Sequence, residues 1–211
     1  MTVVPWARHG ENAANLSRRF SYRVFDGDLT DRGIAQAEHL AEALRAAGHR
    51  YGLLVCSPLR RARQTAQIVS GRLRLPVEAE LEDLREVNVG DLDGRNDDSA
   101  WQAYEATLAR WRSGQLGQRF CGGESGYELA ARIGRALRAV ASWAGPDDAV
   151  VVRRQHPGRG ASSDRTARSR HRPRDRRGGP VHGHPRLRLC YRFRTNNLDL
   201  TAPASSMVHA A

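Results

Sequence analysis

Along roughly the first 150 residues, short apolar runs alternate with longer segments in which apolar residues recur every three or four positions. The runs at residues 2–7, 53–56 and 147–152 have the length and composition of buried strands. The segments between them have the period of amphipathic helices. This alternation predicts an α/β fold, a three-layer sandwich in which helices cover both faces of a mainly parallel sheet.

The first long helix is predicted after residue 29. Thr30 or Asp31 is expected to cap its N-terminus, and Gly48 to end it. Its spacing of apolar residues predicts one buried face. The residues expected on that face are Ile34, Ala37, Leu40, Ala41 and Leu44.

Three further helices are predicted, two of them with recognisable start signals. Ser57 and Pro58 are typical of an N-cap followed by a first-turn proline. Ser125 and Glu128 have the spacing of a capping box. Between these two starts, residues 99–114 have helical spacing, with apolar and aromatic residues on one face.

Two of the predicted strands end at residues that can do chemistry. Arg8 and His9 follow the first strand, in which Pro5 removes a backbone donor and therefore indicates an edge or a bulge. Arg60 and Arg61 follow the second strand closely. Ligands of such sheets bind beyond the carboxyl ends of the strands, so these segments are expected to meet in space.

The charge is unevenly distributed along the chain. The net charge is +11, and every basic residue other than histidine is arginine. Residues 1–152 contain 20 Arg and 20 Asp plus Glu, whereas residues 153–211 contain 14 Arg and three Asp. The sequence therefore predicts a neutral domain over residues 1–152 and a separate basic segment over residues 153–211.

The cysteines and the hydropathy indicate in which cellular compartment the protein is expected. Cys56, Cys121 and Cys190 are widely spaced, which favours neither a disulfide framework nor a zinc site. No apolar run approaches the roughly 18 residues that a membrane span needs, and the N-terminus has no basic leader. A cytoplasmic protein with no membrane partner is expected.

His9 is the first candidate for catalysis. Most histidines after a strand are structural, but Arg8 beside this one provides a planar fork of donors suited to phosphate oxygens. Gly10 lets the backbone approach a ligand closely, and Asn15 adds an amide donor from the same loop. The cluster favours a phosphate site.

Five motifs in order resemble the histidine phosphatase superfamily, the phosphoglycerate-mutase-like proteins. They are RHGENAAN, LTDRGIAQA, SPLRRARQTA, LREVNVGDLDG and GGES, and the resemblance covers about residues 1–152. It implies that His9 is a nucleophile that becomes phosphorylated, with Arg8 and Arg61 holding the phosphoryl oxygens. The implied substrate is a small phosphorylated metabolite.

The resemblance also implies a general acid and separates two neighbouring arginines. Glu86 matches the family's general acid, although without the resemblance it is one carboxylate among several in residues 78–86. Arg61 matches the family's second arginine better than Arg60 does, and Arg60 is interpreted as a solvated helix residue.

The chemistry suits these roles. A neutral imidazole can attack phosphorus and so divide hydrolysis into two steps through phosphohistidine. Guanidinium groups stabilise the charge on the phosphoryl oxygens, and a carboxyl group can protonate the leaving oxygen. Neither a metal ion nor a cofactor is required.

Hydrolysis is favoured over mutase activity. The mutases of this superfamily carry a Gly-Trp pair in the loop before the first long helix, where this chain reads FSYRVFDGDLT, and a longer insertion before their second histidine. A phosphomonoester hydrolase is therefore expected, with a phosphoglycerate-mutase-type phosphotransferase as a further alternative.

The family's second pocket histidine is missing from its expected place. Arg154 stands about where it would fall, and His156 comes two residues later, before a proline. A catalytically impaired or inactive family member is accordingly an alternative, and a fold that is incomplete at the C-terminus goes with it. His156 could take the role only through a bulge or a changed loop.

The basic segment after residue 152 has two interpretations. Its composition is typical of disorder, and a slipped reading frame in GC-rich DNA would produce such an arginine-rich, lysine-free segment. Alternatively, it is a genuine tail that binds nucleic acid through phosphate neutralisation, although few aromatic residues are available for base stacking. Nucleic acid is expected as a partner only through this tail.

Overall fold

The computed structural model describes residues 3–144, 148–153 and 189–194. A five-stranded sheet with the order β3-β2-β4-β1-β5 forms its centre. Strands β1 to β4 pair in parallel, and β5 pairs with β1 in the antiparallel direction. The strands are β1 (Val3–Arg8), β2 (Tyr51–Cys56), β3 (Val77–Glu80), β4 (Asp148–Arg153) and β5 (Leu189–Arg194). The mainly parallel sheet confirms the predicted α/β class.

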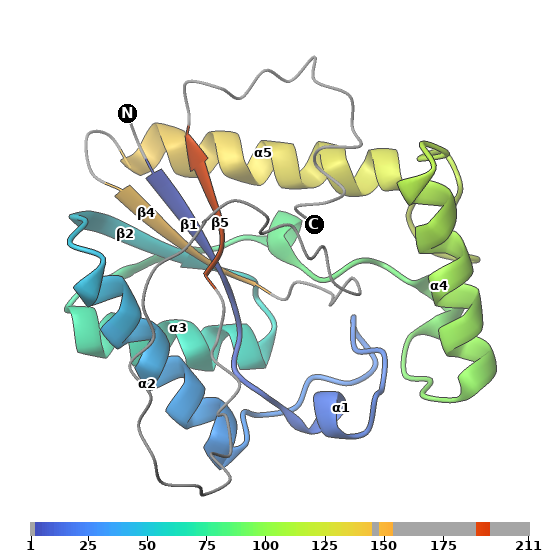
Figure 1. The fold of residues 1–211 in the computed structure, drawn as a ribbon, viewed down its shortest axis with the longest axis horizontal. Coiled ribbons are helices and arrows are strands. Elements are labelled where there is room, and N and C mark those ends of the chain that lie inside the picture. The colour runs from blue at the N-terminus through green and yellow to red at the C-terminus, as the bar shows by residue number, and fades with distance from the viewer. Residues whose placement is uncertain (1–2, 145–147, 154–188, 195–211) are drawn as a thin grey trace, which may run out of the picture.

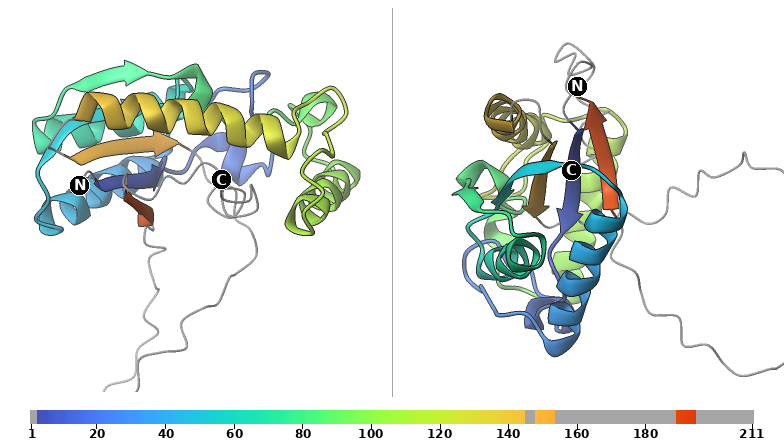
Figure 2. Two further views of the ribbon diagram at one scale, coloured as in Figure 1. Left: turned by 90° about the horizontal axis from the view of Figure 1, so that it is seen from above. Right: turned by 90° about the vertical axis from the view of Figure 1, so that its left-hand side faces the viewer.

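Helices cover both faces of this sheet, as predicted. Helices α2 and α3 lie on one face and α5 lies on the other (Figure 1), and the right-hand view of Figure 2 shows the layers. Helix α4 lies beyond the end of the sheet (Figure 1). The helices are α1 (Ala13–Leu16), α2 (Asp31–Ala46), α3 (Arg60–Leu73), α4 (Asp98–Arg112) and α5 (Gly126–Ala144), with short 3-10 turns η1 (Glu82–Leu84) and η2 (Gly90–Leu92).

The residues of β2 alternate between two hydrophobic cores. Leu53 and Val55 belong to the core shared with α4 and α5, whereas Leu54 and Cys56 belong to the core shared with α2 and α3. Successive side chains of a strand point to opposite faces, so a strand buried on both faces needs an apolar residue at every position. This requirement explains the unbroken apolar run in the sequence.

An aromatic cluster ties α4 to the loop before α2. The ring of Tyr104 stacks on Phe120 with centroids 5.4 Å apart and also lies 5.1 Å from the ring of Phe20. Trp111 meets Phe120 edge-on at 5.3 Å. Phe20 immediately precedes the loop that reaches the candidate site, so this packing helps to place the loop.

Two of the predicted helix starts are confirmed. The Thr30 hydroxyl accepts a hydrogen bond from the Gly33 N–H at 3.1 Å, which caps α2. At the start of α5, the Ser125 N–H donates to the Glu128 carboxylate at 2.9 Å, and the Glu128 N–H donates to the Ser125 hydroxyl at 3.3 Å. Both caps satisfy backbone donors that have no partner within the helix.

The predicted N-cap at Ser57 is wrong. Helix α3 begins at Arg60, and Leu59 occupies the cap position without a side-chain hydrogen bond. The Ser57 hydroxyl instead accepts a hydrogen bond from the Leu59 N–H at 3.4 Å. The turn that follows β2 is therefore longer than the Ser-Pro signal indicates.

Ile34 and Pro5 also differ from expectation. Ile34 is 42% exposed, because Gly33 occupies the buried face in the first turn of α2. The strand that contains Pro5 is internal to the sheet, since β4 and β5 flank it. The irregularity that the proline predicted is present one residue later, as a register shift between Trp6 and Ala7 in the pairing with β5.

Strand β5 corrects part of the prediction for residues 153–211. Its sequence, Leu189–Arg194, is rich in residues that favour strands. Its backbone pairs with an edge of β1 that would otherwise present open hydrogen-bonding groups. Residues 154–188 and 195–211 lie outside the described residues, so the disorder, reading-frame and nucleic-acid hypotheses stay predictions there.

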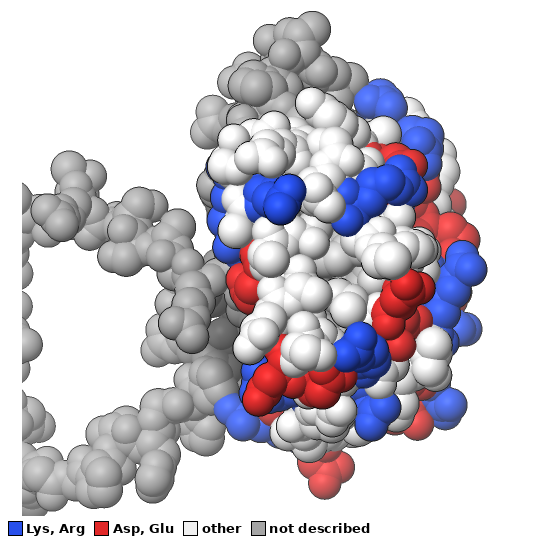
Figure 3. Space-filling view, turned by 90° about the vertical axis from the view of Figure 1, so that its right-hand side faces the viewer, with Lys and Arg blue, Asp and Glu red and all other residues white. Residues whose placement is uncertain are grey.

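The described surface on the α4 side carries charges of both signs, separated by uncharged side chains (Figure 3). The strong basic character of the chain therefore does not extend over this face.

Among the helices of the described residues, none has the length and apolar character that crossing a membrane requires.

Candidate active site

The site lies where the parallel strands β1 and β2 end, at one edge of the sheet. His9 directly follows β1, and the turn at Ser57 directly follows β2. Strand β4 lies between these two strands, with Arg8 in register with Arg153 and Cys56 in register with Val152. The loop from Phe20 to Asp28 closes over the same edge through the contacts described below.

The geometry around His9 fixes its protonation state. The side chain is 2% exposed, and its Nδ1 lies 2.6 Å from the Gly10 carbonyl oxygen. Its Nε2 lies 2.9 Å from Nε of Arg61. A carbonyl oxygen only accepts and a guanidinium only donates, so Nδ1 carries the hydrogen and Nε2 holds the lone pair. The imidazole is therefore neutral, and its unprotonated Nε2 accepts the hydrogen bond from Arg61.

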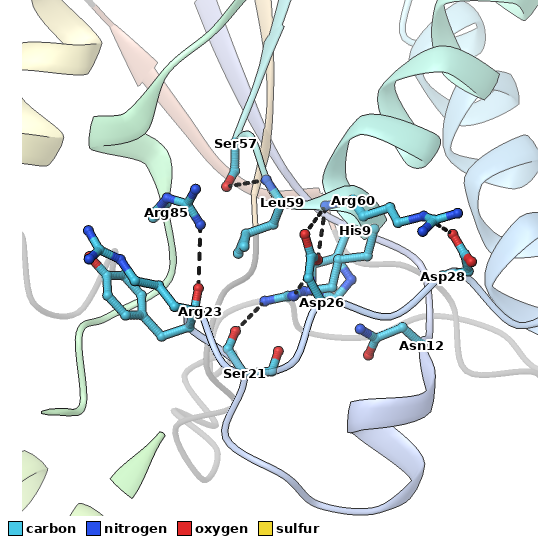
Figure 4. Close-up of polar contacts among 12 residues, drawn as sticks. His9, Asn12, Ser21, Arg23, Asp26, Asp28, Ser57, Leu59, Arg60 and Arg85 are labelled. Carbon is cyan, nitrogen blue, oxygen red and sulfur yellow. Dashed lines mark hydrogen bonds and ion pairs between the residues drawn. The ribbon is translucent and has the colours of Figure 1, made fainter. Parts of the chain in front are cut away.

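Arg61 is fully buried and held on several sides. Its Nη2 donates to the Ser21 carbonyl oxygen at 2.8 Å, and its Nη1 lies 3.4 Å from the Asp26 carboxylate (Figure 4). The same carboxylate accepts from the Arg60 N–H at 2.9 Å, at the first residue of α3. These contacts fix a planar cation against the nucleophile candidate.

Thr65 connects the His9 loop to α3. Its hydroxyl accepts from the Gly10 N–H at 3.1 Å and donates to the Arg61 carbonyl oxygen at 2.8 Å. Gly10 itself packs against α2, because a Cβ there would lie 2.2 Å from the Gly33 carbonyl oxygen. The glycine is therefore required by helix packing, whereas the sequence argument assigned it to the approach of a ligand.

The two adjacent arginines differ as expected. The Arg60 side chain is 61% exposed and pairs with Asp28 at 2.5 Å. The Arg61 side chain is fully buried against His9. This difference agrees with the interpretation of Arg60 as a solvated helix residue.

Arg8 and Asn15 both lie close to His9 in the chain. Arg8 is the last residue of β1 and is half-buried. The Asn15 side-chain oxygen accepts from the Asn12 N–H at 3.2 Å, which makes it part of the capping box of α1. Their roles toward a phosphate stay predictions.

Glu86 differs from the other carboxylates of residues 78–86. It is 6% exposed, and its Oε1 accepts from the Val87 N–H at 3.1 Å. Glu82 is exposed, and the hydrogen bond from Arg85 lowers its pKa below the ordinary value. Glu86 is therefore the buried carboxyl of this segment.

Asn12 and Ser21 are site residues that the sequence did not reveal. Both are buried, and within the described part of the chain the Asn12 amide nitrogen and the Ser21 hydroxyl have no hydrogen-bond partner. Both side chains lie on the same side of His9 in Figure 4. Buried polar groups are almost always paired, so such groups near the buried Arg61 guanidinium indicate a place for an anion. Asn12 could have been suspected from its position three residues after His9, whereas Ser21 gives no sequence signal.

Arg154 and His156, the residues at and just after the expected place of the second histidine, lie outside the described residues.

Within residues 3–144, 148–153 and 189–194, no group of three or more His, Cys, Asp or Glu side chains is arranged to hold a metal ion.

The chain belongs to the histidine phosphatase superfamily. Residues 6–182 match the model of branch 1 of this superfamily. The match reaches beyond residue 152, to which the resemblance seen in the sequence extends.

Known proteins similar to the chain include both mutases and phosphatases by name. A Yersinia pestis (strain Pestoides F) protein named probable phosphoglycerate mutase GpmB is 35% identical over 137 residues, which are 65% of this chain and 62% of that protein. The chain thus spans less than two thirds of the length of this curated relative.

Two solved structures of phosphatases have the same fold. The mycobacterial glucosyl-3-phosphoglycerate phosphatase, in complex with VO3, is 28% identical with a TM-score of 0.60, covering 73% of this chain and 76% of that one. The alpha-ribazole phosphatase of Shigella flexneri is 27% identical with a TM-score of 0.58, covering 73% and 74%.

Proposed function

We propose that the protein hydrolyses phosphomonoesters of small metabolites through a phosphohistidine intermediate on His9. The observation that carries this proposal is the neutral His9 imidazole, whose Nε2 lone pair faces the buried Arg61 guanidinium. A nucleophile in the correct tautomer beside a fixed cation is what an attack on a phosphoryl group needs.

In the first step, His9 Nε2 attacks phosphorus while the bond to the ester oxygen breaks. Arg61 transfers its hydrogen bond from the imidazole to a phosphoryl oxygen as the ester enters, which frees the lone pair. The hydrogen stays on Nδ1 throughout and remains donated to the Gly10 carbonyl oxygen. The leaving oxygen takes its proton from the Glu86 carboxyl group, so an alcohol is released and the phosphoryl group remains on His9.

In the second step, water attacks phosphorus and the N–P bond breaks. The Glu86 carboxylate takes a proton from that water, which restores its carboxyl form. Inorganic phosphate leaves, and the neutral imidazole regains its lone pair. Two easier steps replace one difficult displacement.

The remaining donors suit the phosphoryl oxygens. Arg8 is proposed as a phosphate ligand on the basis of the family motif, and Asn15 on the basis of its side-chain amide in the same loop. Asn12 and Ser21 add two buried donors that lack partners among the described residues. Leaving such a group unsatisfied costs about 1–3 kcal/mol, so a bound phosphate would relieve that cost.

Transfer to a second hydroxyl group, as in a mutase, is the alternative. It is favoured by the name of the Yersinia relative. The loop at Tyr22 and Arg23 carries no Gly-Trp pair, which supports hydrolysis. Incubation of the enzyme with 3-phosphoglycerate distinguishes the two activities, since a hydrolase releases inorganic phosphate and a mutase forms the isomeric phosphoglycerate.

The test of the proposal is turnover of p-nitrophenyl phosphate at mildly acidic pH by the wild type and His9→Ala. We expect His9→Ala to lose nearly all activity. His39→Ala is the matched control, because His39 is exposed on α2, and it should retain the wild-type rate. Equal rates for all three proteins would overturn the assignment, and thermal unfolding of each shows that the fold is kept. A wild type without turnover would support the impaired alternative.

A cytoplasmic location and a small phosphorylated substrate belong to the same proposal. The location is supported by Cys56 and Cys121, which are free thiols, because reduced cysteines are typical of the cytoplasm. Fractionation of cells that produce the protein tests the location.

A further inference from the structure

Arg132, in the middle of α5, uses all of its hydrogen-bonding capacity inside the protein. A guanidinium has five N–H donors and no acceptor. Nε and Nη2 donate to the Glu124 carboxylate at 2.8 and 2.7 Å, and the remaining donors bond backbone carbonyl oxygens. A side chain whose donors are all used has none left for a substrate, so its role must lie in what it holds.

The carbonyl groups that Arg132 holds belong to the segment that carries Glu86. Its Nη1 donates to the carbonyl oxygens of Asp83 and Arg85, and its Nη2 donates to that of Glu86, each at 2.8 Å. Three peptide groups around the turn η1 are thus fixed to one rigid, planar group. The carbonyl oxygen of Glu86 is itself one of the three acceptors.

Glu124 fixes the main chain on the other side of Glu86. Its Oε1 accepts from the Asn88 N–H at 2.8 Å, and its own N–H donates to the Asn88 carbonyl oxygen at 2.9 Å. The Glu124–Arg132 ion pair is largely buried, with side chains 11% and 12% exposed. The backbone is therefore held on both sides of the carboxyl that the proposed mechanism uses as its acid.

We propose that the Arg132–Glu124 pair positions Glu86 for proton transfer to the leaving group. This inference rests on the proposed function, since it assigns the pair a task in that reaction. Neither residue touches the substrate, and both act through the main chain from residue 83 to residue 88. A buried ion pair is a costly way to add stability alone, whereas a planar fork places three carbonyl groups at once in a way that lysine cannot.

Leaving groups of different basicity separate this positioning role from a structural one. A 2,4-dinitrophenolate ion leaves without a proton, whereas a phenolate ion needs one. A displaced general acid therefore slows phenyl phosphate turnover and barely affects 2,4-dinitrophenyl phosphate. Damage to the pocket as a whole would slow both substrates by similar factors.

The experiment measures kcat/KM for both esters with wild type, Arg132→Lys, Glu124→Asp and Glu86→Gln. We expect Arg132→Lys and Glu124→Asp to lose about 10- to 100-fold on phenyl phosphate, the scale of a small misplacement of a reacting group. On 2,4-dinitrophenyl phosphate the loss should stay within about threefold, as in Glu86→Gln. Glu124→Asp keeps the charge and tests the same contacts should Arg132→Lys fail to fold.

Arg135→Lys is the matched control. Arg135 lies one turn further along α5 and pairs with the exposed side of the same segment, with Nη2 2.9 Å from the Asp83 carboxylate. Its side chain is 57% exposed, and its replacement should leave both substrates at wild-type rates. The double variant Arg132→Lys with Glu86→Gln should lose no more on phenyl phosphate than Glu86→Gln alone, because the two residues act in one step.

The outcomes separate the two proposals. Equal losses on both esters, or no loss on either, would overturn the positioning role while leaving the phosphohistidine route intact. A Glu86→Gln variant with no preference for the activated ester would overturn it as well, by removing the general acid. Turnover that does not depend on His9 would instead refute the proposed function itself.

Discussion

At the scale of single residues, the distinctive contact is the hydrogen bond from Arg61 to His9. It shows the nucleophile candidate in its resting state, with its lone pair occupied by the group that would next hold the phosphoryl oxygens. Burial of both side chains keeps water away and makes the contact electrostatically stronger than it would be at the surface. Attack therefore requires the substrate to compete for Arg61.

The adjacent arginines give a matched pair of variants for this contact. Arg61→Lys should lower kcat/KM for p-nitrophenyl phosphate by about 100-fold or more, because a single ammonium cannot replace the fixed fork of donors. Arg60→Lys should stay within about twofold of wild type, since its side chain is exposed. Steady-state kinetics on both variants provide the measurement, and similar losses in the two would contradict the geometry.

Asn12 provides a second test at this scale. Asn12→Asp keeps the shape of the side chain and its capping acceptor but replaces a buried donor with a negative charge. Inorganic phosphate and vanadate should then inhibit at least about tenfold more weakly, since one charge-assisted contact becomes a repulsion. Asn12→Ser, which can still cap α1, should weaken inhibition less. Unchanged inhibition constants in both variants would remove Asn12 from the phosphate site.

At the scale of elements, the sequence predicted correctly those helix starts that depend on hydrogen bonds between residues close together in the chain. Caps such as Thr30 and the Ser125–Glu128 box were found because their hydrogen bonds involve residues three positions apart. The N-cap at Ser57 was wrong because the turn after β2 is shaped by the loop packed on it, where Asp26 accepts from the Arg60 N–H. Such a tertiary contact leaves no local signal.

The capping box makes α5 sensitive to acid. Hydrogen bonds from Ser125 and Arg119 lower the pKa of Glu128 from 4.5 to about 2. A carboxylate with a lowered folded-state pKa stabilises the protein fully above the unfolded value of 4.5, and this stability is lost as the pH falls toward about 2. Glu128→Gln should therefore be less stable than wild type at neutral pH, and the difference should shrink as the pH falls through this window.

Urea unfolding at several pH values measures this difference. Glu42→Gln is a suitable control, because Glu42 is an exposed residue of α2, and its effect should stay small at every pH. A stability difference for Glu128→Gln that is constant from neutral pH to pH 2 would contradict the role of the ionised cap.

At the scale of the whole molecule, the site depends on segments that only the fold brings together. The motifs at His9, Arg61 and Glu86 were recognised from sequence, and the parallel sheet explains why the ends of β1 and β2 meet. Asn12 could have been suspected from its place three residues after His9, but the contribution of Ser21 and the hydrogen bonds from Arg132 to the Glu86 segment could not be predicted. They depend on which way loops fold over the sheet edge, which no period or motif specifies.

The central claim concerns one covalent bond, between His9 Nε2 and phosphorus. It is tested most directly by mixing the full chain with p-nitrophenyl phosphate, quenching rapidly into alkali and measuring the mass of the intact protein. Phosphohistidine is stable in alkali and labile in acid. The wild type should carry one phosphoryl group that acid removes, mapped to the peptide containing His9, and His9→Ala should carry none. A wild type that turns over substrate without this adduct, or an adduct of equal amount in His9→Ala, would contradict the account.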